Sequence, residues 1–179
     1  MGLNHKNSVG LTASSSIVLI LIAVIGLFSG CKVTYSFTGA HTQGLKTFNV
    51  VYFQNRAPIV QAGFSQILTD ALIDKCKAQT SMKYVTDIGD ASFEGEITDY
   101  NTRPLTVGAD ALAATNRFTI SVKVKFTNAI DPSRSFEKSF SGYKDYSSNQ
   151  DLNSVEKDLS DQIVEILVED IFNQAFVNW

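Results

Sequence analysis

Few residues of this chain could carry covalent chemistry, and the most informative of them is Cys31. It follows an uninterrupted apolar run, Ile17 to Phe28, and two small residues, Ser29 and Gly30. Upstream of the run, Lys6 is the only lysine or arginine. A weakly basic head, an apolar middle and a small-residue exit are the features of a secretory signal, so the thiol of Cys31 lies where an exported chain is processed.

The segment Leu27-Phe28-Ser29-Gly30-Cys31 resembles a bacterial lipobox, in which the cysteine thiol is diacylated and the chain is cut before the cysteine. Phe28 occupies the place of the usual leucine, and Leu27 sits one residue further away. The alternative is an uncleaved membrane anchor, but an apolar run of twelve residues at about 1.5 Å each covers roughly 18 Å of a ~30 Å hydrocarbon core. We therefore predict a lipoprotein signal peptide over residues 1–30 and lipidation of Cys31, which would anchor an exported bacterial protein to a membrane.

Other catalytic or metal-binding chemistry finds little support in the sequence. After the predicted leader, His41 is the only histidine and Cys76 is the only other thiol, placed in a helical pattern typical of a core residue. No Cys/His cluster has metal-ligand spacing, and no glycine-rich phosphate loop or nucleophile elbow is present. We predict no enzymatic activity, no cofactor and no metal site, with a hydrolase that uses carboxylates alone as the remaining enzymatic alternative.

Composition limits what the exported part can be. Removal of residues 1–30 leaves 149 of the 179 residues, with 14 basic and 18 acidic side chains. This net charge of −4 argues against nucleic acid as a partner. Residues 31–46 are rich in Ser, Thr, Gly and Gln and are interpreted as a lipidated tether, and residues 47–179 suffice for a single domain with a core.

The pattern of apolar residues predicts an α+β two-layer domain, with a mixed sheet of about four to five strands and two helices packed on one face. The last predicted helix begins at Asn153, and Asn153 and Glu156 have the spacing of a capping box. The expected order is β-α-β-β-β-β-α, over residues 48–53, 61–79, 82–85, 92–103, 117–127, 135–143 and 153–177. The first of these strands is almost wholly apolar, which is typical of a strand buried on both faces.

The two long alternating strands would present one polar face of the sheet. Pairing as a hairpin can place Glu94 opposite Lys125 and Glu96 opposite Lys123, which gives a solvated ladder of opposite charges. The functional alternative is a face that docks a partner or an anionic amphiphile, with Arg117, Lys123 and Lys125 meeting phosphates. Arg117 has no evident acidic partner in the hairpin. The residues expected on this face are Glu94, Glu96, Thr98, Tyr100, Arg117, Thr119, Ser121, Lys123 and Lys125.

The connection between these strands, residues 101–116, is long for a hairpin and contains several apolar residues. Connections of this length are often functional, and the alternative is a flexible tip or a short helical turn at residues 110–114.

Several motifs of the exported part resemble the LptE family of lipopolysaccharide-assembly lipoproteins, in its Bacteroidota form. They are Tyr35–Gly39 after the lipidated cysteine, Tyr52–Pro58, Phe93–Tyr100, Phe136–Ser141, Asp170–Asn173 and Asn178-Trp179. The resemblance implies an LptE-like domain over residues 47–179 that plugs the lumen of an LptD-like outer-membrane β-barrel, helps assemble it and delivers lipopolysaccharide to the cell surface. Lysines 123 and 125 as lipopolysaccharide contacts are inferred from the residues and are not implied by the resemblance.

The residues after the predicted lipidation site bear on localisation. Lys32 stands where an aspartate would favour inner-membrane retention in some bacteria, and residues 33–35 lack the acidic run that accompanies surface export. We expect a lipid anchor in the periplasmic leaflet of the cell outer membrane. The alternative function is a periplasm-facing ligand-binding or transporter-auxiliary lipoprotein, which predicts a ligand cavity where a plug predicts a barrel partner.

Overall fold

A mixed sheet and two helices form the part of the protein that the computed structural model describes, namely residues 42, 44–59, 61–105 and 115–177. All of these residues belong to one unit, Thr38–Trp179. The predicted signal peptide 1–30, Cys31, most of the tether and residues 106–114 of the long connection lie outside the described residues.

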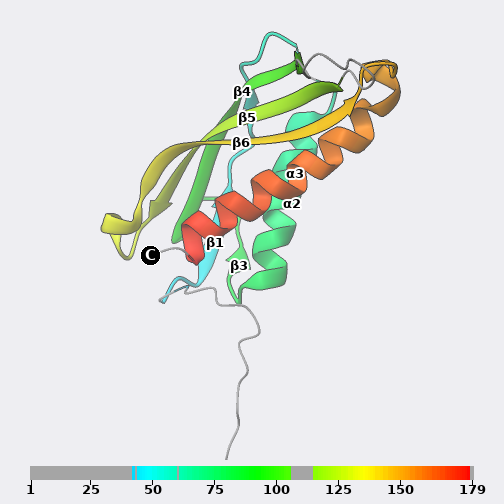
Figure 1. Ribbon diagram of the computed structural model, residues 1–179. Helices are drawn as coiled ribbons and strands as arrows, with labels where there is room; N and C mark the ends of the chain where they lie inside the picture. Colours follow the sequence, from blue (N-terminus) through cyan, green and yellow to red (C-terminus); the bar gives the residue numbers. More distant parts are fainter. Residues whose placement is uncertain (1–41, 43, 60, 106–114, 178–179) are drawn as a thin grey trace, which may run out of the picture. The chain divides into compact units, whose positions relative to one another are not determined.

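The sheet is built from six strands in the order β3-β1-β4-β5-β6, with β2 paired to β4 beside β1. The β1, β2 and β3 pairings are parallel, whereas β4, β5 and β6 pair antiparallel. The two helices pack against the sheet and against each other (Figure 1). In chain order the elements are β1 Thr47–Val50, β2 Gln54–Asn55, α2 Phe64–Gln79, β3 Lys83–Tyr84, β4 Ala91–Leu105, β5 Thr115–Asn128, the 3-10 turn η1 Pro132–Arg134, β6 Phe136–Ser147 and α3 Leu152–Phe176.

The α+β fold predicted from the sequence is confirmed, and its core follows the strand alternation of β5. One face of this strand carries five side chains with no exposed surface: Phe118, Ile120, Val122, Val124 and Phe126. Phe176 near the end of α3 closes the layer, with its ring centroid 5.6 Å from Phe126 and 5.9 Å from Phe93. Burial of each such side chain stabilises the fold by roughly 1.5–3 kcal/mol. The helices therefore cover the face of the sheet that carries these apolar side chains.

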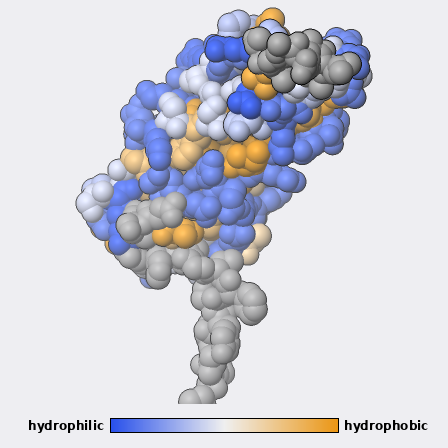
Figure 2. All heavy atoms as spheres, in the orientation of Figure 1, coloured by the Kyte–Doolittle hydropathy of each residue, from blue (hydrophilic) through white to orange (hydrophobic). Residues whose placement is uncertain are grey.

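The face of the domain on which α3 lies shows how the polar residues are distributed (Figure 2). The surface seen in Figure 2 is mostly hydrophilic, with small hydrophobic patches over α3 and the adjoining β6. Within the described residues, no helix is long and apolar enough to cross a membrane.

The prediction that residues 48–53 form one strand buried on both faces is wrong. The strand β1 ends at Val50, and the side chains of Val51 and Tyr52 are each 45% exposed. The Val51 N–H still bonds to the Phe93 carbonyl of β4. The chain then leaves the sheet, because the Phe53 N–H bonds to Thr69 Oγ1 on α2. Phe53 then turns into the core, and the chain rejoins the sheet as β2.

A β-bulge in β4 overturns the predicted outward position of Tyr100. Ile97 pairs with Val122 and Asp99 pairs with Ser121, so Thr98 is an extra residue. A bulge shifts the alternation of every residue after it. Tyr100 is therefore only 8% exposed, and its hydroxyl donates to Glu156 Oε1 at 2.8 Å.

The start of α3 also differs from the prediction. The N-cap is Asp151, whose carboxylate accepts the N–H of Asn153, so Asn153 and Glu156 do not form a capping box. Glu156 is used instead as the acceptor for Tyr100.

Candidate functional site

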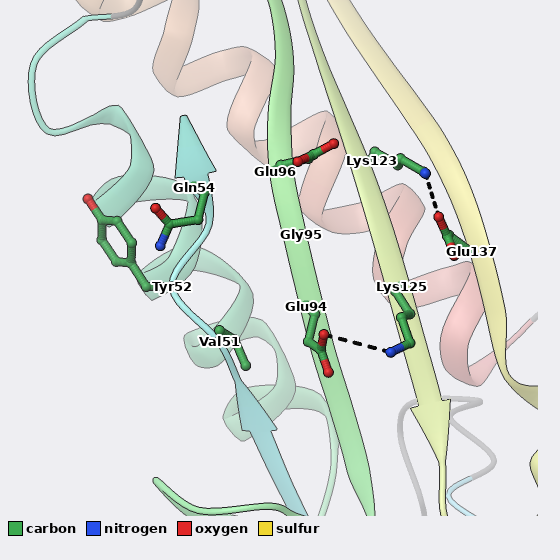
Figure 3. A pocket seen from close by; sticks show the side chains of 9 residues that line it. All are labelled: Val51, Tyr52, Gln54, Glu94, Gly95, Glu96, Lys123, Lys125 and Glu137. Atoms are coloured by element: carbon green, nitrogen blue, oxygen red, sulfur yellow. Dashed lines mark ion pairs between the residues drawn. The ribbon is translucent and has the colours of Figure 1, made fainter. Parts of the chain in front are cut away.

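The polar face of the sheet, on the side away from the helices, is the candidate site, and we call it the outer face. Its side chains come from alternate positions of β4, β5 and β6, and Figure 3 shows part of it with the helices behind the sheet. The predicted contact residues Arg117, Lys123 and Lys125 all lie on this face, and each has an acidic partner.

The two lysines form ion pairs, one of which differs from the expected ladder. Lys125 Nζ lies 3.8 Å from Glu94 Oε2, as the hairpin register predicts. Lys123 forms an ion pair with Glu137 on β6 instead of with Glu96 (Figure 3). Glu96 pairs with Arg56, whose Nε lies 3.5 Å from Glu96 Oε2. Hydrogen bonding and charge between Lys123 and Glu137 raise the pKa of the amine and lower the pKa of the carboxyl. Exposed pairs of this kind contribute about 0–1 kcal/mol each, so they are easily exchanged for another anion.

The expectation that Arg117 has no acidic partner is wrong. Its Nε donates to Asp145 Oδ1 at 2.8 Å and its Nη2 donates to Oδ2 at 3.0 Å, a bidentate pair. The guanidinium also lies over the ring of Tyr143, 3.8 Å from the centroid. These hydrogen bonds raise the pKa of Arg117 and lower that of the Asp145 carboxyl. Asp145 and Tyr143 both belong to β6, whereas the prediction considered only the hairpin of β4 and β5.

The described residues line two hollows in the outer face. The first, of about 370 Å³, has three carboxylates and two amines on its lining and exposes Val51 and Tyr52 at one side (Figure 3). Its charges nearly cancel. The second, of about 410 Å³, holds two arginines and three hydroxyls, and its lining residues are Asp99, Asn101, Arg103, Pro104, Leu105, Arg117, Thr119, Ser121 and Ser141.

Arg103 is the site residue that sequence reasoning missed. It lies directly opposite Arg117 in the β4–β5 register and is exposed. Among the described residues it has no ion-pair or hydrogen-bond partner, and Asp99, the one carboxylate among the lining residues of this hollow, accepts a hydrogen bond from Asn101 at 2.6 Å. Like charges directly opposite one another destabilise a sheet. Arg103 therefore offers an anion a guanidinium that no carboxylate of the described residues holds, beside three hydroxyls, whereas Arg117 is already paired with Asp145.

Cys76 does not offer an alternative site. It has no exposed surface, as predicted for a core residue, and burial raises the pKa of its thiol to about 12. A thiol with so high a pKa is unreactive at neutral pH. In the described part of the chain, no group of three or more His, Cys, Asp or Glu side chains could hold a metal ion.

The fold and the outer face define a two-layer α+β domain with a polar sheet surface, and comparison with known proteins gives its family. A family model described as LptE, lipopolysaccharide-assembly, matches residues 45–175, so the chain belongs to this family. Proteins of the family are outer-membrane lipoproteins of lipopolysaccharide assembly, and it is not a known enzyme family. No curated protein sequence matches the chain.

The solved structures to which the chain is similar share little sequence with it. A minor lipoprotein from Acinetobacter baumannii is 12% identical, with a TM-score of 0.48, over 73% of this chain and 91% of that one. A hypothetical protein from Chlamydia trachomatis is 8% identical, with a TM-score of 0.49, over 75% and 99%. A lipoprotein from Neisseria meningitidis is 14% identical, with a TM-score of 0.39, over 72% and 96%.

Proposed function

We propose that this protein occupies the lumen of an LptD-like outer-membrane β-barrel, helps that barrel assemble and assists the insertion of lipopolysaccharide at the cell surface. Family membership supports the role in lipopolysaccharide assembly. The charged outer face supports a position in the lumen, because the interior of large outer-membrane barrels is polar. In this proposal residues 1–30 are removed as a signal peptide, and the lipid on Cys31 holds the domain at the periplasmic leaflet through the tether 31–46.

We further propose that the outer face contacts the phosphate groups of lipopolysaccharide. The observation that carries this is the Arg103–Arg117 pair, where an unpartnered guanidinium stands opposite one held by Asp145. Arginine binds phosphate through two parallel N–H donors, so Arg103 can engage an anion without breaking an existing ion pair. Lys123 and Lys125 lie further along the same face and are secondary contacts, since each must first leave its carboxylate.

The experiment measures binding of lipopolysaccharide to the full-length lipidated protein in detergent. Arg103→Gln should weaken binding by roughly tenfold, the loss expected for one charge-assisted phosphate contact of about 1.4 kcal/mol. Replacing Lys123 and Lys125 together by Gln should weaken binding less. The lost ion pairs cost no more than about 1–2 kcal/mol of folding stability, so the fold should persist.

The matched control is Lys83→Gln, which removes an exposed positive charge from β3 at the other end of the sheet. Its binding should equal that of the unchanged protein. Lipopolysaccharide from which the phosphates have been removed should bind all variants alike. Equal binding of phosphorylated lipopolysaccharide by Arg103→Gln and by the control would contradict the phosphate contact and leave the outer face as a solvated charge ladder.

A further inference from the structure

Among the described residues, the strand β6 has a neighbouring strand on only one of its two edges. It is 12 residues long and pairs with β5 on one side, and no strand among the described residues pairs with it on the other. The hydrogen bonds found for the described residues include none from another segment to this edge. A row of free N–H and C=O groups is complementary to one kind of ligand above all, another extended chain.

A groove runs along this free edge. Its volume is about 390 Å³, and it is lined by the five consecutive residues 141–145 of β6 and by Ile166 of α3. Gly142 allows this arrangement, because a Cβ atom at that position would lie 2.9 Å from Ile163 Cγ2 on α3. Figure 1 shows β6 and α3 side by side, in agreement with the packing of these two elements. Grooves between a strand edge and a helix bind peptides by strand addition, with pockets for alternate side chains.

We propose that the free edge of β6 binds an extended segment of a partner protein, which adds a strand to the sheet and seats an apolar side chain against Ile166. The groove shares Tyr143 and Asp145 with the surroundings of Arg117, but the partner would bind through the main chain of β6 and through Ile166 on the helix side, so the two proposals are tested separately.

The charges along β6 define the partner more closely. Lys138 and Lys144 flank the uncharged stretch 139–143. Lys138 donates to Gln174, whereas Lys144 has no ion-pair or hydrogen-bond partner among the residues that the structure describes. A segment with an acidic residue opposite Lys144 would be favoured, and a basic one would be repelled. A second copy of β6 is the weaker candidate, because antiparallel pairing centred on Ser141 would place Lys138 of each copy opposite Lys144 of the other, and Glu137 opposite Asp145.

The test uses full-length protein in detergent micelles and three acetylated nine-residue peptides of alternating valine and threonine. The first has a central glutamate, the second a central lysine and the third a central proline. We expect the glutamate peptide to bind at least about tenfold more tightly than the lysine peptide, and the proline peptide not to bind because proline breaks the ladder. Amide exchange should slow at alternate residues of β6 when the glutamate peptide is added.

Two variants separate the edge from general charge effects. Lys144→Glu should reverse the preference between the glutamate and lysine peptides. Lys83→Glu, on the edge strand β3 at the other end of the sheet, should leave the preference unchanged. Equal binding of the proline peptide, or slowed exchange elsewhere than in β6, would overturn the proposal. A dimer in sedimentation experiments that is abolished by Ile166→Lys would also overturn it, since the occupant would then be a second copy.

Discussion

Replacing Gly95 by alanine should destabilise the domain, because the added methyl group would collide with the ring of Phe53. A Cβ atom at position 95 would lie 2.4 Å from Phe53 Cε1 and 2.9 Å from Cδ1 and Cζ. Ordinary contact between carbon atoms is about 3.5–4.0 Å, so the shortest of these distances is too short by about 1 Å. Gly95 thus lets Phe53 lie flat on β4, in the segment that also carries Val51 and Tyr52 to the first hollow.

The cost follows from the burial of the ring. Phe53 has no exposed surface, so its ring can move only into neighbouring core side chains. Overpacking of a close-packed core by one methyl group costs about 1–3 kcal/mol. For a domain of this size, that loss corresponds to a melting temperature lower by roughly 3–12 °C.

Thermal and urea unfolding followed by circular dichroism would measure the effect, and a double-mutant cycle would assign it. In the Gly95→Ala background, Phe53→Leu should relieve the collision, giving a coupling of about 0.5–3 kcal/mol. The control is Gly63→Ala, where φ is 82° and no atom lies within 4 Å of the added Cβ. Its cost comes from the left-handed backbone alone, and Phe53→Leu should not reduce it. Additive effects of the Gly95 and Phe53 changes would refute the reasoning.

Three further predictions concern other parts of the chain. The main-chain N–H groups of Lys46 and Thr47 donate to the Asp90 carboxylate and lower its pKa below the ordinary 3.8. The ionised carboxylate therefore stabilises the fold above pH 3.8, and this stabilisation is lost as the pH falls through the lower pKa of the folded state. Unfolding measured from pH 2 to 6 should therefore show a shallower acid loss in Asp90→Asn, and an unchanged profile would contradict this. Tyr100→Phe removes the hydrogen bond to Glu156 and should cost about 1–3 kcal/mol in thermal unfolding, whereas no change would mean that the pair adds nothing. Cys31→Ala should abolish fatty-acid labelling and leave an uncleaved or mislocalised precursor, and a variant that still labels would disprove the lipobox interpretation.

The features predicted correctly from the sequence are those that depend on a single strand or helix. The alternation of β5 identified its buried face because burial follows directly from a period of two. The β4–β5 register was also predictable up to the bulge, since Glu94 lies opposite Lys125 and Glu96 lies opposite Lys123, as expected.

The candidate site was predicted less completely, because its geometry depends on how several strands meet. The bulge at Thr98 turns Tyr100 into the core and places Arg103 on the outer face, and nothing in the β4 sequence alone marks the extra residue. The partner of Arg117 comes from β6, beyond the predicted end of that strand at residue 143. Within the predicted connection 101–116, residues 101–105 and 115–116 belong to strands β4 and β5.

The most direct test of the proposed function is to isolate the full-length lipoprotein from detergent-solubilised outer membrane and identify what accompanies it. The proposal predicts an LptD-like β-barrel in equal amount that stays bound through gel filtration. Recovery of the lipoprotein alone, or with subunits of an inner-membrane lipid transporter, would contradict the plug and favour a separate binding or auxiliary role.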